Sequence, residues 1–138
     1  MGRVIIKWRK GKGSVFISHS TGRIAPNKWG KLDQIEREDY IKGIVKNLLH
    51  EPASGALLAK LVLGESHIYE LQKEYFLASE GMHSGQHIFC GKKAQINVGN
   101  IFLLKEIPEG SLVYNVEQYQ GIKDAFEKAS GSYGLIVY

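Results

Sequence analysis

Acidic residues are missing from the first part of this chain, where neither aspartate nor glutamate occurs before Asp33. The same stretch holds eight basic residues: Arg3, Lys7, Arg9, Lys10, Lys12, Arg23, Lys28 and Lys31. From Asp33 onward the other ten of the 18 basic residues face all 14 acidic ones. The net charge of +4 therefore combines a basic segment with a mildly acidic remainder. A basic segment of this kind favours a polyanionic partner, and nucleic acid is the first candidate.

Long apolar runs are also missing, because no stretch approaches the ~20 apolar residues that a membrane-spanning helix requires. Charged residues interrupt the apolar ones from Met1 to Lys12, so we expect no secretory signal peptide. Cys90 is the only cysteine, which excludes an internal disulfide and agrees with a reducing compartment. We therefore expect a cytosolic protein without a membrane partner.

Turn-forming residues divide the chain after Asp33 into short apolar segments about 8–12 residues apart, a pattern typical of small β barrels and sandwiches. The expected strands cover residues 40–49, 56–63, 67–71, 74–78 and 86–90, and then 100–107, 111–118 and 133–138. In the second strand the expected buried face is Leu57, Ala59, Leu61 and Leu63. Short helices over 32–39 and 122–129 are the alternatives.

The pattern predicts a basic arm over residues 1–32, a β unit over 33–89 and a second β unit over 90–138. The arm contains too little apolar surface to offset its ordering entropy, so we expect it to become ordered on a partner. Trp8 and Trp29 lie within the arm. Aromatic rings among cations suit stacking on unpaired bases, and the alternative is that they attach the arm to the β units.

Two short patterns suggest other chemistry. The run from Lys10 to Ser14 resembles a phosphate loop, but it lacks the required glycine–lysine spacing and does not join a strand to a helix. Its glycines and lysines suit the phosphates of RNA. His83, His87 and Cys90 are zinc-compatible ligand types, but no nearby cysteine supplies a fourth ligand. The carboxylates are scattered, so we expect no catalytic set, no enzyme, no small-molecule substrate and no metal site.

Ordered segments along the chain resemble one family, the universal second protein of the large ribosomal subunit (the L-two family). They include Gly11-Lys12-Gly13-Ser14-Val15-Phe16, Ser18-His19, His50-Glu51-Pro52, Glu80-Gly81-Met82, Cys90-Gly91-Lys92-Lys93-Ala94, Ile107-Pro108-Glu109-Gly110 and Ala129-Ser130-Gly131-Ser132-Tyr133. The Cys-Gly-Lys-Lys-Ala and Ile-Pro-Glu-Gly segments are similar to the eukaryotic branch.

This resemblance implies an all-β fold, with an OB-type five-stranded barrel followed by an incomplete SH3-like barrel. It also implies a structural constituent of the large subunit that binds ribosomal RNA, contacts neighbouring ribosomal proteins and supports subunit assembly and the architecture around the peptidyl transferase centre. No cofactor is implied, and Mg²⁺ enters only as a counter-ion of RNA. The location implied is the cytosolic ribosome, with a nucleolar stage during assembly in a eukaryote. The expected RNA-binding residues are the eight basic residues of the arm together with Ser14, His19, Lys92, Lys93 and Lys128.

The chain departs from the family pattern in its length, because it stops partway into the second barrel. Lys128 stands where bacterial relatives carry an RNA-contacting arginine, which keeps the charge but loses the bidentate fork. The alternative function is a free-standing OB module for single-stranded nucleic acid, which would stack bases on Tyr69, Tyr75, Phe76 or Phe89.

Overall fold

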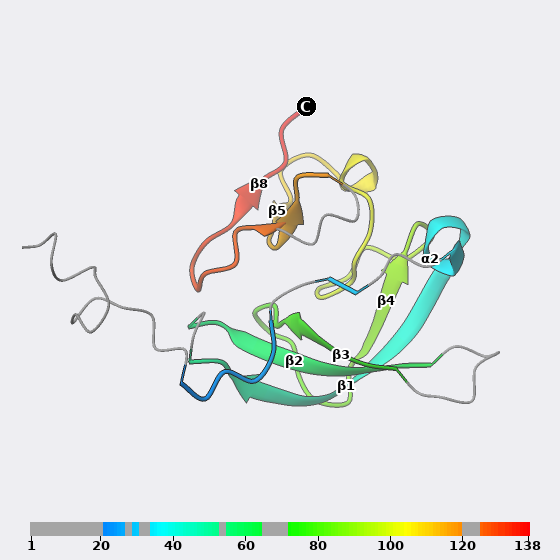
Figure 1. Ribbon diagram of the computed structural model, residues 1–138. Helices are drawn as coiled ribbons and strands as arrows, with labels where there is room; N and C mark the ends of the chain where they lie inside the picture. The colour runs from blue at the N-terminus through cyan, green and yellow to red at the C-terminus, as the bar shows by residue number, and fades with distance from the viewer. Residues whose placement is uncertain (1–20, 27–28, 31–33, 53–54, 65–71, 120–124) are drawn as a thin grey trace, which may run out of the picture.

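The computed structural model describes residues 21–26, 29–30, 34–52, 55–64, 72–119 and 125–138 (Figure 1). A short helix, α2, comes first, and strands β1 to β4 follow it. A 3-10 helix, η1, and four two-residue strands, β5 to β8, make up the rest. Their bounds are α2 Gln34–Glu38, β1 Tyr40–His50, β2 Leu57–Gly64, β3 Gln72–Leu77, β4 His87–Gly91, η1 Leu104–Glu106, β5 Leu112–Val113, β6 Val116–Glu117, β7 Ala125–Phe126 and β8 Gly134–Leu135.

The four longer strands form one antiparallel sheet in the order β3-β2-β1-β4. Its strands match four of the five predicted for the first unit, and the predicted strand 67–71 lies outside the described residues. The expectation of an all-β fold is confirmed, because strands dominate the described residues and helix is confined to short segments. Closure of the sheet into a barrel stays a prediction, as do the domain boundaries.

One face of this sheet, here called the inner face, carries the core. Val45, Ala59, Leu61, Ile88 and Cys90 are each at most 2% exposed, and Phe76 and Met82 join the same cluster. Trp29, Ala78 and Ile101 pack against it. The alternation of apolar and polar residues along each strand produces this one-sided burial, because successive side chains point to opposite faces.

A bulge between Val45 and Asn47 shifts the pairing of β1 with β2 by one residue. The predicted buried face of β2 is correct for Ala59, Leu61 and Leu63 but wrong for Leu57, which is 49% exposed. Leu57 begins β2 and pairs with the exposed His50, beyond the end of the core. Leu58 is fully buried instead, because it pairs with Leu49 on one side and with Leu77 on the other.

The second part of the chain joins the sheet through backbone hydrogen bonds. Ile101 forms a parallel bridge with Cys90, its N–H donates to the Phe89 carbonyl, and its carbonyl accepts from the Gly91 N–H. Farther along, the Tyr114 hydroxyl donates to the Leu77 carbonyl at 3.4 Å. In Figure 1, β5 and β8 lie above one side of the four-stranded sheet.

Two strands predicted for this second part are much shorter than expected. Residues 100–107 contain only the Ile101 bridge before η1, which precedes Pro108. Residues 111–118 divide into β5 and β6, because the backbone of Asn115 is left-handed (φ 54°) and cannot continue a strand. The predicted strand 133–138 is reduced to the two residues of β8.

The two alternative helices have opposite outcomes. The helix predicted over 32–39 is confirmed by α2. The helix predicted over 122–129 is wrong for its described part, because Ala125 and Phe126 form β7 and pair with β6. The pairing shows that tertiary context overrides the helical spacing of these apolar residues. Among the described residues no helix is both long and apolar enough to cross a bilayer.

Candidate nucleic-acid interface

Most of the predicted RNA-binding residues lie outside the described part of the chain. These are Arg3, Lys7, Arg9, Lys10, Lys12, Ser14, His19, Lys28 and Lys31. The structure describes the other four, which are Arg23, Lys92, Lys93 and Lys128. They lie on three separate segments, which do not pair with one another as strands.

Arg23 is exposed and lies within the predicted arm, in the described segment 21–26. The next residue, Ile24, donates its backbone N–H to the Glu51 carboxylate at 3.0 Å. Glu51 is only 1% exposed, and it follows directly after β1. A buried carboxylate is stabilised by hydrogen bonds from N–H groups, so this contact holds the end of the arm against the turn between β1 and β2. The arm therefore leaves the sheet from a fixed point.

Lys92 and Lys93 are exposed and follow β4 directly. Their backbone N–H groups donate to the carbonyls of Glu36 (3.0 Å) and Asp39 (3.4 Å), which ties them to α2 and to the start of β1. The Lys93 ammonium also lies 3.8 Å from the Asp39 carboxylate, and both side chains are more than half exposed. An exposed ion pair of this length contributes little, so the ammonium can exchange that partner for a phosphate.

Lys128 is half-buried and follows β7. The preceding Glu127 has a left-handed backbone (φ 56°), its carbonyl accepts from the Asn115 N–H, and its carboxylate accepts from the Ser132 hydroxyl. These contacts order the segment that carries Lys128. Lys128 therefore lies on a different segment of the second unit from Lys92 and Lys93.

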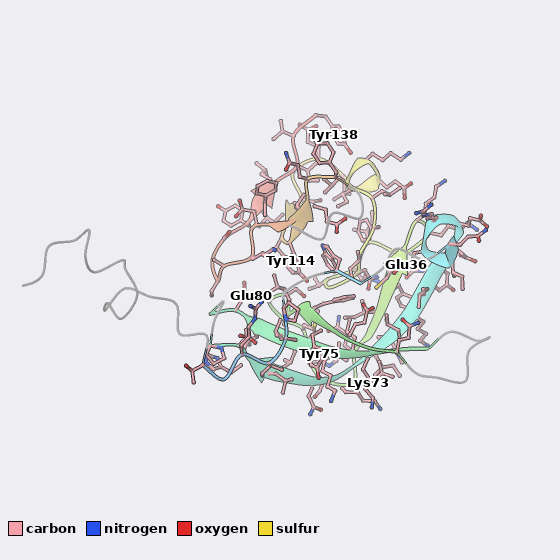
Figure 2. All side chains as sticks on the ribbon, viewed as in Figure 1. Glu36, Lys73, Tyr75, Glu80, Tyr114 and Tyr138 are labelled. Atoms are coloured by element: carbon pink, nitrogen blue, oxygen red, sulfur yellow. The ribbon has the colours of Figure 1, made fainter. Side chains whose placement is uncertain are left out.

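A further set of cations lies on the four-stranded sheet, on the side opposite the core. We call this side the outer face and define it by Tyr40, Lys42 and Ile44 of β1, Lys60 and Val62 of β2, Lys73 and Tyr75 of β3, and His87 and Phe89 of β4. In the register, Lys42 lies opposite Phe89 and Lys60 lies opposite Tyr75. Figure 2 shows Lys73 and Tyr75 on the side of the sheet away from Tyr114 and Tyr138.

The outer face combines exposed charge with half-buried rings. Lys42, Lys73 and His87 are exposed, whereas Lys60, Tyr75 and Phe89 are half-buried. The rings of Tyr40 and Phe89 meet edge to face with their centroids 5.5 Å apart. Among the described strand residues that define this face, none is acidic. Directly opposed residues in antiparallel strands have Cβ atoms ~5 Å apart, so each of two aromatic rings has a lysine as its neighbour.

The RNA-binding residues predicted from the sequence did not include the lysines of the outer face. Alternation along β1 and β2 signals that Lys42 and Lys60 point away from the core, but it does not place them beside particular aromatic residues. Of the aromatic residues predicted for base stacking, Phe76 is in the core and meets Trp29 with ring centroids 4.9 Å apart. Tyr75 and Phe89 lie on the outer face, and Tyr69 is outside the described residues.

The zinc-type pattern of His83, His87 and Cys90 is not assembled. Cys90 faces the core, whereas His87 belongs to the outer face of the same strand. His83 lies in a loop, where its Nδ1 is 3.1 Å from the Ser84 carbonyl oxygen. In the described ranges no three histidine, cysteine or acidic side chains are grouped as metal ligands.

Cys90 is also unsuited to act as a nucleophile. Burial, together with the smaller effect of the negative charges of Glu36 and Glu74, raises the pKa of its thiol from 9.0 to about 12. The thiolate is the reactive form of cysteine, so a thiol with this pKa stays protonated and inert at neutral pH. Tyr114 has a raised pKa as well, mainly because burial disfavours the charged form of its hydroxyl. These groups serve packing rather than catalysis.

A family model described as "Ribosomal Proteins L2, RNA binding N-terminal domain" matches residues 1–90. The matched range contains the whole basic arm and all strands of the four-stranded sheet up to Cys90. Three of the curated proteins to which the chain is similar carry the name large ribosomal subunit protein uL2 or uL2A.

The Saccharomyces cerevisiae protein uL2A is 48% identical over 137 residues, which are 99% of this chain and 54% of that protein. The Tetrahymena thermophila protein uL2 is 46% identical over 138 residues, 99% of this chain and 52% of that protein. The Drosophila melanogaster protein uL2 is 42% identical over 137 residues, which are 99% of this chain and 54% of that protein. The chain thus spans about half the length of these curated relatives, whose names are those of ribosomal proteins and not of enzymes.

Proposed function

The chain belongs to the family of Ribosomal Proteins L2 that share the RNA-binding N-terminal domain, and from this premise we propose that it is a structural, RNA-binding constituent of the large ribosomal subunit. The observation that carries the proposal is the match of the family model over residues 1–90. It is supported by 42–48% identity to proteins named uL2 over nearly the whole chain. The partners are then large-subunit ribosomal RNA and neighbouring ribosomal proteins.

The basic arm supplies most of the phosphate contacts in this proposal. Its eight lysines and arginines have no acidic residue among them before Asp33, so their charges add along the arm. Glu51 fixes the point at which the arm leaves the sheet, through its contact with Ile24. Ser14 and His19 add hydrogen-bonding groups to the arm, and Lys92, Lys93 and Lys128 add cations from the rest of the chain.

The finer role proposed is support of subunit assembly and of the architecture around the peptidyl transferase centre. This role is structural, and it requires neither a cofactor nor a resident metal; Mg²⁺ would act as a counter-ion of the RNA. The corresponding location is the cytosolic ribosome, with passage through the nucleolus during assembly in a eukaryote.

A filter-binding experiment with purified large-subunit ribosomal RNA tests the proposal, with small-subunit ribosomal RNA as the competitor. If about six phosphates are neutralised, the logarithm of the affinity falls with the logarithm of the salt concentration at a slope of about −4 to −5. Removal of residues 2–20, which takes away five of the eight basic residues and leaves Ile24 and Trp29 in place, should abolish most of this slope. An affinity that is independent of salt, or equal for the two RNAs, would refute the proposal.

The alternative of a free-standing module for single-stranded nucleic acid is favoured by one observation, the aromatic and basic outer face of the sheet. The two functions differ in where the protein is found. Co-sedimentation of the tagged chain with large subunits in a sucrose gradient supports the ribosomal function. Its recovery only in the light fractions, bound to oligonucleotides, supports the alternative.

A further inference from the structure

We propose that the outer face of the four-stranded sheet binds an unpaired segment of RNA, with bases stacked on Tyr75 and Phe89 and phosphates held by Lys42, Lys60 and Lys73. This inference rests on the proposed function and deepens it, because it adds a second RNA contact to that of the basic arm. It also specifies the kind of RNA that the second contact recognises.

Charge complementarity is the first argument. Three lysines from three neighbouring strands share the outer face, and no acidic residue is among the described residues that define it. The acidic residue of β3, Glu74, pairs with Leu61 of the core and belongs to the inner side. Alternation along β3 therefore directs Glu74 to the side opposite that of Lys73 and Tyr75, and the outer face offers a polyanion three lysines.

The arrangement of the rings is the second argument. Each of the two aromatic residues is opposite a lysine, Phe89 beside Lys42 and Tyr75 beside Lys60. A base stacked on either ring would place its own phosphate within reach of the neighbouring ammonium. Half-buried rings on a sheet are held by their neighbours, so they lose little conformational freedom when a base stacks on them.

The distance between the rings indicates a binding site longer than one nucleotide. Phe89 of β4 pairs with Lys42 of β1, which pairs in turn with Gly64 of β2. Tyr75 of β3 pairs with Lys60 of β2. The two rings are therefore separated by three strand spacings and by four residues along a strand, which corresponds to roughly 20 Å. This span fits an extended strand of several nucleotides that crosses the sheet diagonally.

A shallow, open hollow beside Tyr75 connects the outer face with the arm. Lys73, Glu74 and Tyr75 of β3 line one side of it, and Ala25, Pro26 and Gly30 line the other. The described part of the basic arm therefore lies beside one of the proposed stacking residues.

Double-stranded RNA does not fit this surface as well. The bases of a duplex are stacked on each other and present no free face, and the major groove of an RNA helix is too deep and narrow for a sheet to enter. A flat arrangement of rings and lysines is instead typical of proteins that bind single strands.

The first test measures fluorescence anisotropy of the full chain with a labelled oligouridine of about 12 nucleotides and with an RNA duplex of the same length. Tyr75→Leu and Phe89→Leu keep an apolar side chain but remove the ring. Each should weaken oligouridine binding about fivefold or more and change duplex binding much less. Tyr119→Leu, which changes an exposed tyrosine outside the sheet, is the matched control and should bind as the unaltered chain does.

The lysines are tested by salt dependence. The triple variant Lys42→Gln, Lys60→Gln, Lys73→Gln should reduce the slope of log affinity against log salt for oligouridine by about 2, because each phosphate contact on a single strand contributes about 0.7. Lys105→Gln changes an exposed lysine in η1, away from the outer face, and is the control for loss of a single charge. It should leave the slope nearly unchanged. An unchanged slope in the triple variant would overturn the inference.

A measurement on the unaltered chain covers the case in which a variant fails to fold. Photo-cross-linking to 4-thiouridine RNA, followed by mass spectrometry, should label peptides that contain Tyr75 or Phe89. Cross-links confined to residues 1–31 would refute the outer face as a contact while leaving the proposed function intact. The proposed function itself fails if the unaltered chain does not bind large-subunit ribosomal RNA in preference to small-subunit ribosomal RNA, so the two failures are distinguishable.

Discussion

Replacement of Cys90 by alanine should change how the stability of this protein depends on pH. The thiol is 2% exposed within the core of the sheet, and burial together with the charges of Glu36 and Glu74 raises its pKa from 9.0 to about 12. A raised pKa means that the folded state binds the thiol proton more tightly than the unfolded state does. The stability that depends on the neutral thiol is therefore complete below about pH 9 and is lost as pH rises from about 9 to 12.

The size of the effect follows from the two pKa values. At about pH 10 the thiol of the unfolded chain is about nine-tenths ionised, whereas the folded protein keeps it protonated. The corresponding loss of unfolding free energy between neutral pH and about pH 10 is about 1.4 kcal/mol. Cys90→Ala has no thiol to ionise. At neutral pH the variant should be about 1 kcal/mol less stable, because it leaves a small cavity, and at about pH 10 this difference should vanish or reverse.

Urea unfolding followed by circular dichroism checks this prediction, with both proteins measured at the two pH values in the presence of a reductant. All other groups titrate in both proteins, so their contributions cancel in the comparison. A stability difference that is the same at neutral and alkaline pH would refute the reasoning. Thiol labelling gives an independent check, because Cys90 should react slowly in the folded chain and rapidly in urea.

Two substitutions elsewhere in the fold should lower the free energy of unfolding by amounts that the structure predicts. In Gly91→Ala the added Cβ would overlap with the carbonyl oxygen of Asp39 at a φ of +140°, so we expect a loss of more than about 2 kcal/mol in urea unfolding. Gly110→Ala, at a φ of +81° with open space around it, is the control and should lose only about 1 kcal/mol; equal losses would contradict the overlap. Trp29→Phe removes the indole N–H that donates to the Asn115 carbonyl at 3.0 Å and should cost about 1–2 kcal/mol. Unchanged stability of that variant would show that this hydrogen bond does not hold the two parts of the chain together.

Local patterns in the sequence were sufficient for several features. The absence of acidic residues before Asp33 marked the basic arm, and alternation of apolar residues located β1 to β4 within a few residues of their bounds. Strand periodicity also separated His87 from Cys90, which argued against a metal site before the structure placed Cys90 in the core. These features depend on neighbours in sequence, and therefore no partner from elsewhere in the chain is needed to define them.

Other features could not be obtained in this way, because distant residues determine them. The left-handed backbone of Asn115 interrupts a predicted strand, and its carbonyl is fixed by Trp29, which lies 86 positions earlier. Ala125 and Phe126 have helical spacing but pair with β6 as a strand. The bulge after Val45 cannot be recognised from the local sequence of β1. It nevertheless determines which residues of β2 pair with those of β1.

The division between sequence and tertiary structure is clearest on the outer face of the sheet. The sequence by itself determined that Lys42 and Lys60 alternate with core residues, because side chains along a strand point to opposite faces in turn. Lys73 lies before the predicted strand 74–78, so its place on the outer face came from the structure. Only the tertiary structure decided that Lys42 lies opposite Phe89 and Lys60 opposite Tyr75. The register between strands is a property of long-range pairing and of the bulge, and neither is visible within one strand.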